Sequence, residues 1–87
     1  MEKNNKSPLK RLKNALKKEN MRLTDQRLSI WPQINKSNKH LDVEDIFSQL
    51  RRKGINVSRA TIYRTLDVLV KNGLIRKMDL GEGYNLY

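Results

Sequence analysis

The stretch Ser58-Arg59-Ala60-Thr61-Ile62-Tyr63-Arg64-Thr65-Leu66 decides the fold. Serine is a favoured helix N-cap, and Ile62 and Leu66 recur at the spacing that places side chains on one buried side of a helix. The other side carries arginine, threonine and tyrosine, which suit a polyanionic partner. The stretch therefore predicts a helix whose exposed face binds DNA.

This helix is predicted to run from a Ser58 cap to Asn72 and to stop at Gly73. Its buried stripe is expected to consist of Ile62, Leu66, Leu69 and Val70. An earlier helix starts at the cap residue Asp42 and stops at Gly54. That helix has the clearest apolar stripe in the chain: Val43, Ile46, Phe47 and Leu50. Residues 55–57 between the two helices are a short connector or a brief strand, so the pair predicts a helix-turn-helix.

After Gly73, the spacing of the apolar residues changes from that of a helix to that of a strand. Residues 74–78 predict a strand, 79–83 a glycine-rich turn, and 84–87 a returning strand. A hairpin placed directly after a helix-turn-helix is a β wing. The second helix of the pair then enters the major groove with its capped end toward the bases.

Two further helices are predicted near the N-terminus. The first has Ser7 as its cap, Pro8 at its first position, and a buried stripe of Leu9, Leu12 and Leu16. The second starts at the cap residue Thr24 and contains Trp31 as a core residue. Pro32 follows directly and should kink or shorten that helix, because proline lacks a backbone donor.

The predicted fold class is therefore α+β, mainly α: a winged helix-turn-helix of four helices followed by a two-stranded β wing. Residues 1–8 are expected to be a flexible basic N-terminus, and residues 9–87 the winged-helix DNA-binding domain.

Charge is the dominant feature of the composition. The 87 residues include 19 Lys and Arg against 9 Asp and Glu, which gives a net charge of +10. Such an imbalance attracts nucleic acid, anionic membranes or acidic proteins. The first helix has a basic face that carries Lys13 and Lys17. Taken alone, this face is consistent with any of these partners or with simple exposure to solvent.

Several classes of protein are disfavoured. The chain has no cysteine, which excludes disulfides and thiolate sites. No apolar run is long enough to cross a membrane, so a cytoplasmic protein is expected. One histidine, with no carboxylate pair or phosphate loop in a plausible setting, argues against an enzyme.

Four motifs resemble the N-terminal domain of the ferric uptake regulator (Fur) family. They occur in the family's order and spacing over roughly residues 9–87: Arg22-x-Thr24-x-x-Arg27, His40-x-x-x-Glu44-Asp45-Ile46, Ala60-Thr61-Ile62-Tyr63-Arg64-Thr65-Leu66, and Gly73-Leu74-Ile75. Two departures are Asp25, where proline is frequent, and Pro32, which falls inside a helix that is regular in the family.

The resemblance implies a metal-responsive transcriptional repressor that binds an A/T-rich palindromic operator as a dimer. Tyr63 and Arg64 would lie in the major groove, Arg22 would reach toward a narrow minor groove, and the lysines of the first helix would lie near the backbone. The full set of predicted DNA-binding residues is Lys13, Lys17, Arg22, Thr24, Arg27, Ser58, Arg59, Thr61, Tyr63, Arg64 and Lys77.

The resemblance also bears on metals and partners. It makes His40 a metal ligand in a full-length protein, with Fe, Mn or Zn as the implied ion. The family's C-terminal domain, which dimerises and binds metal, is absent from this sequence, so no cofactor is expected in this chain. Full-length relatives would be homodimers, and this domain by itself a monomer or weak dimer.

Two alternatives remain open from the sequence. One is a winged-helix protein-interaction module, which would be expected to lack a basic recognition face. The other is a basic peripheral membrane-binding domain that uses the first helix.

Overall fold

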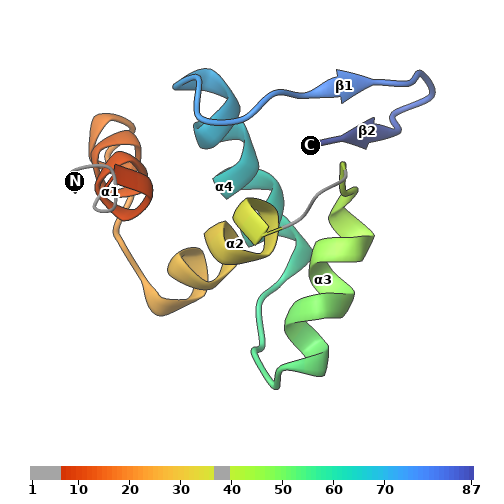
Figure 1. Cartoon of the computed structure of the whole chain (residues 1–87), viewed down its shortest axis with the longest axis horizontal. Helices are drawn as coiled ribbons and strands as arrows, with labels where there is room; N and C mark the ends of the chain where they lie inside the picture. The colour runs from red at the N-terminus through yellow and green to blue at the C-terminus, as the bar shows by residue number, and fades with distance from the viewer. Residues whose placement is uncertain (1–6, 37–39) are drawn as a thin grey trace.

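The computed structural model describes residues 7–36 and 40–87, and these form the predicted order of four helices and a hairpin (Figure 1). The helices are α1 (Ser7–Lys18), α2 (Asp25–Lys36), α3 (Val43–Arg52) and α4 (Arg59–Lys71). The strands β1 (Met78–Asp79) and β2 (Asn85–Leu86) pair antiparallel, with Met78 opposite Leu86. The predicted flexible segment 1–8 lies mostly outside the described residues.

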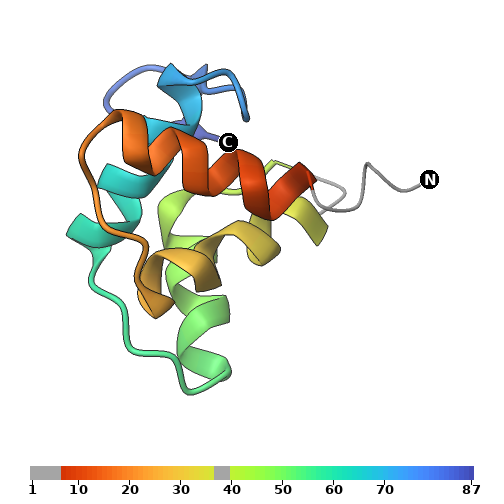
Figure 2. The ribbon, with the colours of Figure 1, turned by 90° about the vertical axis from the view of Figure 1, so that its left-hand side faces the viewer.

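All four helices contribute to one core. Helices α2, α3 and α4 pack on one another, and α1 packs against α4. Seen from the side of α1, this helix lies across the outside of the other three (Figure 2). The fully buried aliphatic residues come from all four helices: Leu12, Leu16, Ile30, Ile46, Leu50, Ile62, Leu66 and Leu69.

Helix caps confirm three predicted starts. Asp42 accepts the amide of Asp45 at 2.7 Å, and the Asp45 side chain accepts the amide of Asp42, which is a complete capping box. Ser58 accepts the amide of Thr61 at 3.1 Å. Thr24 accepts the amide of Arg27 at 3.2 Å.

Some predicted details were wrong. Helix α1 begins at Ser7 itself, so Ser7 is not its cap, and the side chain of Leu9 lies outside the described part. Of the two alternatives for residues 55–57, the structure has the short connector and not the strand. In α4, Thr65 and Val68 are buried while Val70 is only half-buried.

Helix α2 runs without interruption through Pro32 to Lys36. The predicted shortening does not occur, because the proline removes only one backbone donor, while buried neighbours such as Ile30 and Trp31 hold the helix against the core.

The wing is smaller than predicted. Leu74 and Ile75 pack against the core instead of pairing, and β1 begins only at Met78. The hairpin is closed by a hydrogen bond of 2.9 Å from the amide of Leu80 to the carbonyl of Tyr84, and its turn contains Glu82 at a φ of 52°.

Candidate nucleic-acid interface

The N-terminal turn of α4 is held by its own hydroxyl groups. Ser58 Oγ donates to Thr61 Oγ1 at 3.0 Å in addition to accepting the Thr61 amide. Thr65, one turn later and fully buried, donates to the carbonyl of Thr61 at 2.8 Å. Ser58 thus already donates its hydroxyl proton within the helix cap, whereas Thr61 Oγ1 only accepts in that bond and keeps its own proton for donation to a phosphate.

Arg59 is the predicted contact whose surroundings differ most from expectation. Its Nε donates to Glu44 Oε2 at 2.7 Å, and its Nη2 donates to Glu44 Oε1 at 3.0 Å. Its guanidinium carbon lies 4.0 Å from the centre of the Phe47 ring. The side chain is therefore engaged with α3 instead of extending freely from α4.

The predicted major-groove residues Tyr63 and Arg64 are both exposed. Tyr63 is 47% exposed and lies at a small hollow of about 100 Å³ that is also lined by Glu44 and Tyr84. Arg64 makes no side-chain hydrogen bond or ion pair with the described residues. Of the two arginines in the first turns of α4, Arg64 is thus the one available to a partner.

The loop before α2 lies beside the turn before α4. Arg27 donates from Nη1 to the carbonyl of Arg22 at 2.7 Å, which shapes the loop and leaves the Arg22 side chain exposed. Gln26 donates from Nε2 to the carbonyl of Asn56 at 3.3 Å. These bonds bring Arg22, Thr24 and Arg27 close to the start of the predicted recognition helix.

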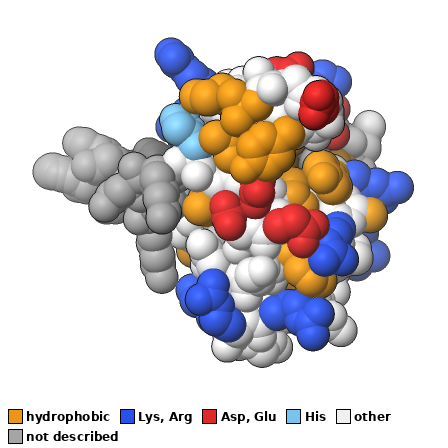
Figure 3. All heavy atoms as spheres, turned by 90° about the vertical axis from the view of Figure 1, so that its right-hand side faces the viewer, with side chains coloured by type: hydrophobic (Ala, Val, Ile, Leu, Met, Phe, Trp, Pro, Cys, Tyr) orange, Lys and Arg blue, Asp and Glu red, His pale blue; other side chains and the backbone are white. Residues whose placement is uncertain are grey.

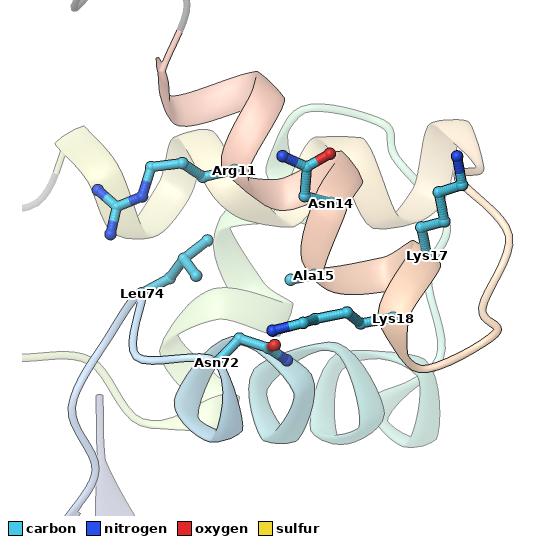
Figure 4. A pocket seen from close by; sticks show the side chains of 7 residues that line it. All are labelled: Arg11, Asn14, Ala15, Lys17, Lys18, Asn72 and Leu74. Atoms are coloured by element: carbon cyan, nitrogen blue, oxygen red, sulfur yellow. The ribbon is translucent and has the colours of Figure 1, made fainter.

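Helix α1 supplies a separate basic surface. Lys13 and Lys17 are exposed, and Arg11, Lys17 and Lys18 surround an open hollow of about 570 Å³ next to the end of α4 (Figure 4). Glu19 and Lys71 form an ion pair of 3.2 Å that joins the end of α1 to the end of α4. The basic helix is thus attached to α4 at the end opposite Ser58.

The remaining two predicted residues lie elsewhere. Lys77 is exposed directly before β1, and His40 is exposed directly before Leu41. Within residues 7–36 and 40–87, no three His, Cys, Asp or Glu side chains are grouped in a way that could hold a metal ion. His40 and its described neighbours therefore do not form a metal site by themselves.

The hairpin end carries a surface that the sequence patterns did not single out. Figure 3 shows hydrophobic side chains gathered there, with acidic side chains beside them. The exposed hydrophobic residues of the hairpin are Met78, Leu80 and Tyr84. The negative charge of Asp42 raises the pKa of Tyr84, with burial adding to the effect. Met78 begins β1 and Leu80 directly follows that strand, so their spacing of two positions is the one signal that could have indicated this patch.

The family model described as "Ferric uptake regulator family" matches residues 18–87. The chain belongs to the ferric uptake regulator family. Its fold is the winged helix of Fur DNA-binding domains, and the match falls on the N-terminal, DNA-binding region of Fur proteins.

Relatives with established names support this membership. The "Ferric uptake regulation protein" of Synechococcus elongatus is 36% identical over 78 residues, which cover 87% of this chain and 53% of the relative. The solved Helicobacter pylori regulator Fur, which has three functional metal-binding sites, is 29% identical with a TM-score of 0.80, over 94% of this chain and 55% of that one. The Francisella tularensis regulator, solved with iron, is 31% identical with a TM-score of 0.69, over 77% and 52%.

The chain thus spans about half the length of the Fur proteins that it matches. No helix in the described part of the chain has both the length and the apolar character needed to cross a membrane.

Proposed function

We propose that this chain binds A/T-rich operator DNA as the DNA-binding domain of a metal-responsive repressor that acts in the cytoplasm. In this proposal α4 enters the major groove, where Tyr63 packs on thymine methyl groups and Arg64 bonds to base edges or phosphates. Arg22 reaches toward the adjacent minor groove. Homodimerisation and metal binding would belong to the full-length protein, in which His40 would be one of the metal ligands.

One observation carries the proposal: Arg64 and Tyr63 are exposed on the first two turns of a capped helix that follows a short turn and precedes a hairpin. The α2 loop with Arg22 lies beside that turn through the bond from Gln26 to Asn56. The net charge of +10 favours a polyanion over a neutral partner.

A fluorescence-anisotropy titration tests the proposal. An A/T-rich palindromic duplex and a G/C-rich duplex of equal length are each titrated with the wild-type chain and with Arg64→Ala and Tyr63→Ala. Each substitution should weaken binding to the A/T-rich duplex by about 1–3 kcal/mol and narrow the difference between the duplexes.

Two results would count against it. If the substitutions weakened binding to both duplexes equally, α4 would not be the element that recognises the DNA sequence. Efficient competition by anionic vesicles, with no preference among duplexes, would favour the membrane-binding alternative.

A further inference from the structure

Arg59 is held by two residues of α3 at once. Glu44 and Phe47 are three positions apart, so they lie on the same side of that helix. The carboxylate of Glu44 takes two hydrogen bonds from the guanidinium, at 2.7 and 3.0 Å, and the ring of Phe47 lies 4.0 Å from its central carbon. Both partners therefore fix the position and the orientation of the guanidinium plane.

The geometry separates this pair from an ordinary surface ion pair. Exposed ion pairs are usually weak, but a bidentate arginine-carboxylate bond with a ring contact is the arrangement that holds best. The other exposed pair in the described part, Glu19 with Lys71, has a single contact of 3.2 Å and no ring. Arg59 would have to give up two hydrogen bonds and a ring contact to extend toward a partner.

The place of Arg59 in α4 makes its attachment to Glu44 and Phe47 important for DNA binding. It is the first residue of α4, at the end of the helix that the proposed function directs into the groove. A free arginine there would add a contact to phosphate, which strengthens binding to every duplex regardless of sequence.

We propose that Glu44 is a positioning residue of the DNA-binding surface: it retains Arg59 on α3 and so keeps one cation out of the set that contacts phosphates. This lowers sequence-independent affinity. The inference rests on the proposed function.

The most direct test keeps the charge constant. Arg59→Lys leaves the net charge unchanged but cannot form the two parallel bonds or the flat ring contact. If retention limits binding, this variant should bind a random duplex about two- to fivefold more tightly than the wild type at 50 mM salt. Glu44→Gln should gain about three- to tenfold, and its advantage over the wild type should shrink about threefold between 50 and 200 mM salt, as one added phosphate contact requires.

Two controls separate the alternatives. Glu19→Gln removes the same charge from the pair at the other end of α4 and should change random-duplex affinity less than Glu44→Gln. The double variant Glu44→Gln with Arg59→Gln removes the whole pair without changing the net charge, and should bind with the affinity and salt dependence of the wild type. Circular dichroism of each variant confirms that the fold is retained.

Distinct results would overturn the inference. If the double variant binds more weakly and loses about 0.9 from its salt slope, Arg59 already contacts phosphate in the complex. If Glu19→Gln gains as much as Glu44→Gln, or Arg59→Lys gains nothing, the effect is one of total charge and not of retention. If the wild type binds no duplex even at 50 mM salt, the proposed function itself fails.

Discussion

The main chains of Leu41 and Tyr87 exchange two hydrogen bonds, from the amide of Leu41 to the carbonyl of Tyr87 at 3.0 Å and in the reverse direction at 2.8 Å. This exchange attaches the end of the hairpin to the segment directly before α3. Tyr87 is 6% exposed and Leu41 is buried, so the attachment also extends the core under the wing.

Tyr87→Ala should therefore lower the free energy of unfolding by about 3 kcal/mol, the loss expected for a buried aromatic residue. Urea denaturation followed by circular dichroism measures the change. Tyr84→Ala is the matched control, since Tyr84 lies on the same hairpin but is 49% exposed, and it should change stability by less than about 1 kcal/mol. Similar losses for both variants would contradict the role given to Tyr87.

The pair of Glu44 with Arg59 predicts a dependence on pH. The hydrogen bond from Arg59 is the main cause that lowers the pKa of Glu44, and the charge of Arg59 adds to it. A lowered pKa in the folded state means that the stabilisation is fully present above the ordinary pKa of a glutamate. It is lost as the pH falls through the lowered value.

Between pH 7 and pH 3, the difference in urea midpoint between the wild type and Glu44→Gln should shrink. In an NMR titration, the midpoint of the Glu44 carboxylate should move up in Arg59→Gln. An unchanged midpoint in that variant would show that the pair is not formed in solution.

Lys13 and Lys17 are expected to act through charge alone, because both are exposed on α1, which the ion pair of Glu19 with Lys71 attaches to the end of α4 opposite Ser58. Replacing both with Gln should weaken binding to A/T-rich and G/C-rich duplexes equally. The salt slope should fall by about 0.9 for each lysine that contacts a phosphate. Anisotropy titrations at several salt concentrations measure both effects, and a loss confined to the A/T-rich duplex would contradict this assignment.

Pro32 offers a test of helix energetics. It lies inside α2, where it lacks the amide that would bond to the carbonyl of Leu28. Pro32→Ala restores that donor and should raise the free energy of unfolding by about 1–3 kcal/mol. Pro32→Gly, which restores the donor without the helix preference of alanine, should gain about 1 kcal/mol less. A loss of stability in Pro32→Ala would mean that packing of the ring outweighs the missing bond.

The local features of the fold were predictable because they depend on near neighbours in the sequence. The caps at Asp42 and Ser58 each bond to a residue three positions later, and the apolar stripe of α3 needs only helical spacing. The helix pair followed by a hairpin predicted the winged helix, and the family motif from Ala60 to Leu66 agreed with it.

What the sequence did not predict depends on contacts between distant residues. Arg59 was predicted only as a DNA-binding residue on the exposed face, because its partner Glu44 is fifteen positions away and meets it only when α3 packs on α4. The first strand was predicted four residues too early, because Leu74 and Ile75 have strand-like side chains that the core takes up instead. The sequence pattern alone does not distinguish a residue whose backbone pairs in a sheet from a residue whose side chain packs in the core.

The bond from Gln26 to the carbonyl of Asn56 has a consequence for how the domain would meet a duplex. Together with the bond from Arg27 to the carbonyl of Arg22, it joins the Arg22 loop to the turn that starts α4. In the proposed function, these two bonds would hold Arg22 and the start of α4 at a defined separation before DNA binds. If the proposed function holds, the domain would select duplexes by groove width and spacing, and the narrow minor groove of the proposed A/T-rich operator would fit because of its dimensions as well as its bases.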